Sequence, residues 1–269
     1  MNRKDIALGL SLAFMVLAIS IVISIEGIGP IIPIDIRGLG ASYLWNSYNP
    51  WNTTLTSFSL NAVTAIIWDY RGLDTFYETA VLFASIVAIL MVLRGYIEVK
   101  GLGVKGLSDI TKTATKIILP LIVTYGFATA VHGQITPGGG FQGGAIAVVA
   151  STLIIAVLSI EYIYELGISS SKLMLLRVFG FLGIIATSIS LAIIGMLIGV
   201  DTYIFQNMAK ENSLSMPINF LDTTLAGSIF IFNLFEFIIV FSGLTFALIM
   251  LTIREEELRN IDTVVEVYE

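Results

Sequence analysis

One stretch near the end of the sequence decides the class of fold. Leu225–Ile253 reads LAGSIFIFNLFEFIIVFSGLTFALIMLTI, and its one ionisable residue is Glu236. A helix that crosses the hydrocarbon core of a bilayer needs about 20 predominantly apolar residues. The stretch therefore predicts a membrane-spanning α-helix with a carboxyl group near its middle.

Five further apolar runs lie upstream and complete the predicted architecture. They are Ile6–Ile25, Thr75–Leu93, Ile117–Val131, Gly140–Tyr162 and Leu173–Ile198. The third run is short and contains Pro120, which predicts either a kink or an earlier start of that helix. The chain is 56% hydrophobic and 13% charged, against about 25% charged residues in ordinary globular proteins. We expect an all-α integral membrane protein with about six transmembrane helices.

The distribution of basic residues predicts the orientation in the membrane. With the N-terminus in the cytoplasm, the outer segments hold Arg37, Arg71 and Lys210. The inner segments then hold the other eleven of the fourteen Lys and Arg residues, Lys172 and Arg177 among them. Because cytoplasmic segments carry an excess of Lys and Arg, we expect both termini in the cytoplasm.

The composition also restricts the chemistry that this chain can perform. It has no cysteine and a single histidine, which excludes disulfides, cysteine-ligated clusters and a histidine metal cluster within the chain. The net charge of −6 argues against nucleic acid as a partner. We expect no catalytic site, cofactor or metal in this chain, so any redox centre belongs to a partner subunit.

A basic segment, Arg94–Lys116, divides the predicted helices into two groups. The expected organisation is a two-span part with a long outer loop at 1–95, a cytoplasmic linker at 96–116, a four-span domain at 117–253 and an acidic cytoplasmic tail at 254–269.

A glycine-rich segment joins the third and fourth predicted spans. His132–Gly144 reads HGQITPGGGFQGG. Glycine backbone at membrane depth is tolerated only where protein or water covers it. We expect a structural turn formed by Pro137, Gly138, Gly139, Gly140 and Phe141.

Polar residues inside the last apolar run are the first candidates for function. An ionised carboxylate at the bilayer centre costs several kcal/mol, so Glu236 should be protonated, paired or hydrated. Asn233 lies three residues earlier on the same helical face. Two interpretations stay open: a carrier site for protons or cations, or a hydrogen bond that joins two helices.

A second acidic group lies at the start of the second predicted span. Asp74 and Glu78 are spaced i, i+4 and share a helical face, with Arg71 nearby. The functional interpretation is a cation entry or exit; the alternative is a helix cap with an interfacial ion pair. At the end of the third span, His132 fits either a proton relay or a hydrogen-bonded structural residue.

The motif at His132–Gly144 resembles the signature of the MnhB (MrpB) subunit of multisubunit cation/proton antiporters. The resemblance covers roughly Thr111–Ile253 and implies a four-span subunit. In the last span the chain has Phe232-Asn233 where the family carries a Phe-Asp pair, with Glu236 one turn further on.

The first part has a resemblance of its own. Asn61–Glu78 is similar to a segment near the C-terminal end of the large MrpA subunit, so the chain looks like a fusion of an MrpA-tail-like part with an MnhB-like part. Related modules occur in membrane-bound hydrogenases and similar respiratory complexes, where Fe–S or NiFe centres belong to other subunits.

The resemblance implies an accessory membrane subunit of a multisubunit Na+/H+-translocating complex in the cytoplasmic membrane of a prokaryote. Its partners would be other antiporter-type subunits, the lipid bilayer, Na+ and H+. Two alternatives stay open: the same module as the ion-pumping arm of a hydrogenase-type redox complex, and a purely structural scaffold. The expected ion or proton path comprises Glu236, Asn233, Glu78, Asp74 and His132.

Overall fold

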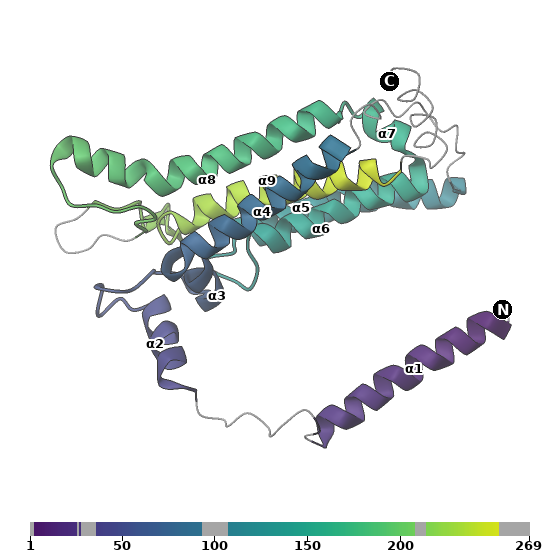
Figure 1. Ribbon diagram of the computed structural model, residues 1–269, viewed down its shortest axis with the longest axis horizontal. Helices are drawn as coiled ribbons and strands as arrows, with labels where there is room; N and C mark the ends of the chain where they lie inside the picture. Colours follow the sequence, from purple (N-terminus) through teal and green to yellow (C-terminus); the bar gives the residue numbers. More distant parts are fainter. Residues whose placement is uncertain (1–2, 26, 28–35, 93–106, 208–213, 253–269) are drawn as a thin grey trace, which may run out of the picture. The chain divides into compact units, whose positions relative to one another are not determined.

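The computed structural model of the chain describes residues 3–25, 27, 36–92, 107–207 and 214–252. Within these residues, six helices are long and apolar enough to cross a membrane (Figure 1). They cover Ile6–Ser24, Gly72–Ile89, Asp109–Val131, Gly140–Leu158, Ser170–Ile198 and Ile229–Met250. The expected all-α fold with six spans is confirmed, whereas the cytoplasmic position of both termini stays a prediction.

The chain divides into two compact units, Met1–Ser42 and Tyr43–Glu269. The first unit holds α1 (Arg3–Ser24) and the start of α2 (Gly38–Ser47). No residue in the spanning window of α1 is buried inside the chain. Because an apolar helix surface is unfavourable in water, lipid, the rest of the chain or another protein must cover this helix.

The second unit joins the two parts that the sequence separates near residue 95. Its helix α4 (Gly72–Val92) packs against both α8 (Ser170–Ile198) and α9 (Ile229–Met250). The fusion of two modules therefore stays a prediction about origin. The expected tail at 254–269 and most of the expected linker at 96–116 lie outside the described residues.

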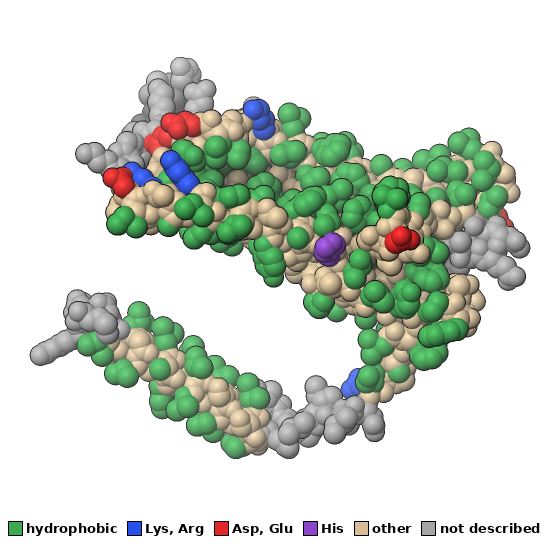
Figure 2. Space-filling model, turned by 180° about the vertical axis from the view of Figure 1, so that it is seen from behind, with side chains coloured by type: hydrophobic (Ala, Val, Ile, Leu, Met, Phe, Trp, Pro, Cys, Tyr) green, Lys and Arg blue, Asp and Glu red, His purple; other side chains and the backbone are tan. Residues whose placement is uncertain are grey.

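Helix α9 lies at the centre of the second unit, between α8 and α6 (Gly140–Leu153) in Figure 1. Its side chains Phe232, Ile239 and Phe246 are fully buried. Small residues on the neighbouring helices permit this packing: a Cβ atom on Gly180 of α8 would lie 2.7 Å from Ile239. The face that Figure 2 shows is instead dominated by hydrophobic side chains, with the visible Lys and Arg side chains of the second unit toward one end.

The third span begins earlier than its apolar run. Helix α5 covers Asp109–Val131, eight residues before the expected start at Ile117, and so takes in part of the expected linker. The Ser108 hydroxyl accepts a hydrogen bond from the Thr111 N–H at 3.4 Å and caps the first turn. The first turn of α5 is polar, so a prediction based on the length of the apolar run does not include it. Pro120 lies inside the helix, as expected.

The fourth span ends sooner than expected. Helix α6 continues into a π-helical turn, η2 (Ile154–Leu158), and the chain then leaves helical geometry at Ser159, whose φ is 149°. A short helix, α7 (Ile160–Glu165), follows in a new direction. The expected single run Gly140–Tyr162 is therefore two elements.

The segments before α4 and α9 close one end of the second unit. The first contains the end of α2, α3 (Ala62–Thr64) and the π-helical η1 (Ala65–Tyr70). The second contains a short antiparallel hairpin of β1 (Asn219–Phe220) and β2 (Thr223–Thr224), which the sequence did not indicate. Helix α9 begins only at Ile229, because Leu225–Ser228 form a turn that the Asn207 side chain holds.

Candidate functional site

The candidate site is centred on two polar side chains on the buried face of α9. Asn233 is fully buried and Glu236 is 4% exposed. Both face the beginning of α6, where the glycine-rich segment ends. The pair that the sequence predicted on one helical face therefore lies in the interior of the helix bundle.

Glu236 accepts a hydrogen bond from the first turn of α6. The Phe141 N–H donates to Oε2 of Glu236 at 3.1 Å, and the Gly140 N–H donates to Oδ1 of Asn233 at 3.4 Å. The first N–H groups of a helix have no partner within the helix, and the helix dipole makes this end positive. The start of α6 therefore stabilises a negative charge on Glu236 in surroundings that exclude water.

Glycines allow α9 to come this close to the turn. A Cβ atom on Gly140 would lie 2.7 Å from Cβ of Glu236, and one on Gly133 would lie 2.7 Å from Nδ2 of Asn233. Gly138 and Gly139 have φ values of 144° and 157°, a region that residues with side chains rarely adopt. The expected structural turn thus has two physical requirements, an unusual backbone and the absence of side-chain atoms.

The turn is held from the opposite side by two residues that sequence reasoning missed. The Asn61 side chain donates to the Gly133 carbonyl at 2.7 Å and to the Thr136 carbonyl at 3.0 Å. The Thr64 hydroxyl also donates to the Gly133 carbonyl, at 2.8 Å. Asn61 also caps α3, because its side-chain Oδ1 accepts a hydrogen bond from the Val63 N–H at 3.1 Å. The Asn-x-x-Thr spacing before a helical turn was the available signal for a cap.

Trp68 of η1 completes the surroundings of the carboxylate. Its ring is fully buried and stacks on Phe232, with centroids 4.6 Å apart and planes 10° apart. Its indole N–H is buried and has no hydrogen-bond partner within the described residues.

Glu78 is the second acidic residue of this region. It is exposed on the surface of α4, about one turn into the spanning segment. A carboxylate on the outside of a spanning helix requires water or a protein partner beside it.

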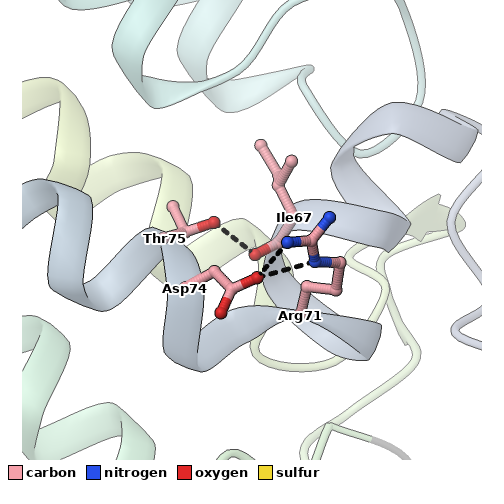
Figure 3. Close-up of polar contacts among 4 residues, drawn as sticks. All are labelled: Ile67, Arg71, Asp74 and Thr75. Atoms are coloured by element: carbon pink, nitrogen blue, oxygen red, sulfur yellow. Dashed lines mark hydrogen bonds and ion pairs between the residues drawn. The ribbon is translucent and has the colours of Figure 1, made fainter.

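The remaining predicted site residues have other surroundings. Asp74 forms an ion pair with Arg71, whose Nε donates to Oδ2 at 2.6 Å, and the next residue, Thr75, donates to the Ile67 carbonyl at 2.6 Å (Figure 3). His132 ends α5 and is exposed, as Figure 2 shows for the single histidine. Within the described part of the chain, neither Asp74 nor His132 bonds to Glu236.

Arg177 is a buried charge that the sequence assigned to a cytoplasmic segment. Its side chain is fully buried on α8. Nη2 donates to the Leu82 carbonyl at 3.1 Å, and the guanidinium lies 4.5 Å from the centroid of the Phe83 ring. Its Nε and Nη1 atoms have no hydrogen-bond partner among the described residues. Its position inside the apolar run Leu173–Ile198 was the signal for burial.

The side chains that the structure describes give little indication of a metal-binding site. No group of three His, Asp or Glu residues lies together there. The absence of a cofactor or metal from this chain stays an expectation.

The fold and the buried polar pair define a helical membrane protein whose ionisable group lies inside the bundle. Residues 110–246, about half of the chain, match the family described as a domain related to the MnhB subunit of the Na+/H+ antiporter. The chain belongs to this family, and the predicted resemblance is confirmed.

Three known proteins are similar to this chain in sequence or in fold. An uncharacterized protein of Methanocaldococcus jannaschii is 29% identical over 211 residues, which cover 71% of this chain and 77% of that protein. A chain of the membrane-bound sulfane sulfur reductase, an archaeal respiratory membrane complex, has a similar fold, with a TM-score of 0.61 and 24% identity over 92% of this chain and all of that one. A chain of the Mrp complex of Dietzia sp. has a TM-score of 0.57 and 18% identity, over 93% of this chain and 26% of that one.

Proposed function

We propose that this protein is an accessory membrane subunit of a multisubunit complex that moves Na+ or H+, and that Glu236 is a binding site on the path. The observation that carries the proposal is the carboxylate of Glu236 at the start of α6, where the Phe141 N–H and the helix dipole stabilise its charge. Buried ionisable groups in membrane spans are costly and usually serve transport.

The geometry supports a site that is loaded and unloaded by small movements. When Glu236 is ionised, it accepts the Phe141 N–H at 3.1 Å and neutralises the positive end of α6. When a proton or Na+ binds to the carboxylate, this attraction weakens. Asn233 offers a carbonyl oxygen beside it, which suits either a cation ligand or a hydrogen-bonded proton.

Glu78 and the turn have supporting roles in this proposal. Glu78, exposed on α4, would pass the ion between a neighbouring subunit and Glu236. Asp74, paired with Arg71, and His132, exposed at the end of α5, would lie at the outer entrance to this path. The turn from Pro137 to Phe141 would keep the first N–H groups of α6 directed at the carboxylate.

The test is the substitution Glu236→Gln in the assembled complex, measured as Na+-dependent proton movement in inverted membrane vesicles. Gln keeps the volume and can accept the Phe141 N–H, but it can neither bind a proton nor carry charge. We expect transport to fall to the level of vesicles without the complex while the complex still assembles. The matched control is Glu165→Gln on α7, which should leave transport unchanged.

A purely structural role predicts the opposite result. If an assembled Glu236→Gln complex transports ions at the normal rate, the carboxylate is not on the path. The protein would then be a scaffold whose Glu236 joins α9 to α6.

A second candidate function places the same subunit in a redox-driven pump. It is favoured by the likeness to a chain of an archaeal respiratory complex, because that chain is covered over its whole length. In the Mrp complex, the similar region is instead about a quarter of one longer chain. The alignment covers 93% of this chain and so includes both expected modules. Purification of the native complex in mild detergent separates the two: co-purifying iron–sulfur subunits identify the redox-driven complex, and membrane subunits alone identify the gradient-driven one.

A further inference from the structure

A pocket of about 460 Å³ opens on the second unit beside α5, away from the Glu236 site. This volume lies within the range of about 300–1,000 Å³ that ligand sites usually have. Its wall is mainly apolar and includes Leu119 and Val123 of α5, Ala150 of α6, Ile154 of η2 and Phe241 of α9. The pocket therefore suits a hydrocarbon chain better than a polar ligand.

The fold explains why a pocket forms at this place. The backbone leaves helical geometry at Ser159, so α7 does not continue the line of α6 and η2. Tyr162 of α7 and Ile168, which precedes α8, then form the far wall. Pro120 lies on the near wall, inside α5.

One positive charge lies in the wall of this apolar pocket. The Nζ atom of Lys116 is 5.6 Å from the centroid of the Tyr162 ring, which holds the ammonium group over the aromatic face. Lys116 is exposed and forms no ion pair with any described residue. Lys112 lies one turn earlier on the same face of α5. The charge of Lys116 is thus available to an anionic ligand.

The position along the helix indicates what the anion is. Lys116 directly precedes the apolar run that starts at Ile117, so its ammonium group can reach the level of the lipid headgroups. On the face of the second unit that Figure 2 shows, the visible Lys and Arg side chains lie toward one end. Basic pockets between spanning helices bind anionic headgroups, while the acyl chain stays in the hydrocarbon layer.

We propose that this pocket binds one anionic phospholipid, with an acyl chain between Val123 and Ile154 and the headgroup phosphate at Lys116. Neither acidic residue of α7, Glu161 or Glu165, lines the pocket. The lipid would fill the space that the break at Ser159 leaves and would join α5 to α7.

The experiment uses the complete complex in phosphatidylcholine nanodiscs that contain a trace of phosphatidylglycerol with a photoreactive acyl chain. A phosphatidylcholine probe with the same chain serves for comparison. After irradiation, labelled peptides are identified by mass spectrometry. We expect labels within 116–123 and 150–154, about fivefold more from the anionic probe, which is the effect of one lysine near an anionic surface.

Three variants separate the contribution of the Lys116 charge from that of the apolar pocket. Lys116→Gln should remove the preference for the anionic probe, whereas Lys172→Gln, a charge-matched change that does not line the pocket, should preserve it. Val123→Trp should fill the pocket and abolish labelling by both probes. Equal labelling by both probes in the unaltered complex would overturn the proposal, as would an unchanged preference in Lys116→Gln. A pocket that is covered by a neighbouring subunit and takes no label from either probe would overturn it as well.

Discussion

Asn61 shows how a single residue can hold a membrane-embedded turn. The residue lies far from the glycine segment in sequence, yet its amide group donates to the carbonyls of Gly133 and Thr136. A buried carbonyl that loses its donor costs about 1–3 kcal/mol, because no water replaces the bond. The amide group thus positions the segment that leads into the candidate site.

Removal of this amide group should destabilise the protein measurably. We expect Asn61→Ala to lower the free energy of unfolding by about 2 kcal/mol, because it leaves buried carbonyls without partners. The measurement is thermal unfolding of the purified complex in detergent. The matched control is Asn52→Ala, an exposed asparagine of the same segment, which should shift the midpoint little. Equal shifts for both variants would contradict the assigned role.

At the scale of elements, the contact between α6 and α9 decides the geometry of the candidate site. The start of α6 lies against Glu236 because Gly140, which faces it, has no side chain. Further along the same pair of helices, the Ser151 and Thr245 hydroxyls share a hydrogen bond of 2.9 Å. The two helices are thus joined by polar contacts at both places, and α6 keeps its positive end directed at the carboxylate.

A single methyl group at the start of α6 should disturb this contact. In Gly140→Ala, the new Cβ atom would lie 2.7 Å from Cβ of Glu236, so the helices must move apart. Such overpacking costs about 1–3 kcal/mol. We expect less assembled complex and weaker transport, measured by size-exclusion chromatography and vesicle assays. Gly9→Ala in α1, where the added Cβ meets no atom within 4 Å, is the control; the proposal fails if both variants behave alike.

At the scale of the whole molecule, the predicted orientation in the membrane depends on which end of the second unit carries the basic residues. Its two ends differ: α3 and its neighbours lie at one end, and α7 lies at the other (Figure 1). The predicted orientation places the α7 end in the cytoplasm, since Lys112, Lys116 and Lys172 are near it.

Labelling of single cysteines can test this orientation directly, because the chain has no cysteine. In intact cells, we expect a membrane-impermeant maleimide to label Thr53→Cys and to leave Glu165→Cys unlabelled until the cells are permeabilised. Both positions are exposed, so accessibility within the protein does not limit either reaction. The reverse pattern would invert the predicted topology.

The amino-acid sequence by itself determined the number and approximate positions of the membrane spans. This succeeded because the length of an apolar run is a local property, and the bilayer demands the same length everywhere. It located the ends of the helices less well, although the short third run did predict an earlier start of that helix as one alternative. The start of α5 at Asp109 and the break at Ser159 depend on a cap and on a backbone angle, which apolarity does not report. The glycine motif also revealed the family without any structural knowledge.

The tertiary structure alone decided what each polar residue contacts. Glu236 and Phe141 are 95 residues apart in the chain. Only the packing shows that the Glu236 carboxylate accepts a hydrogen bond from the Phe141 N–H in the first turn of α6. Packing also separated Glu236 from Asp74, which is paired with Arg71 at the surface, and it buried Arg177 among apolar helices. The physical reason is that charge stabilisation depends on distances between elements, whereas the sequence encodes directly only the neighbours along one helix.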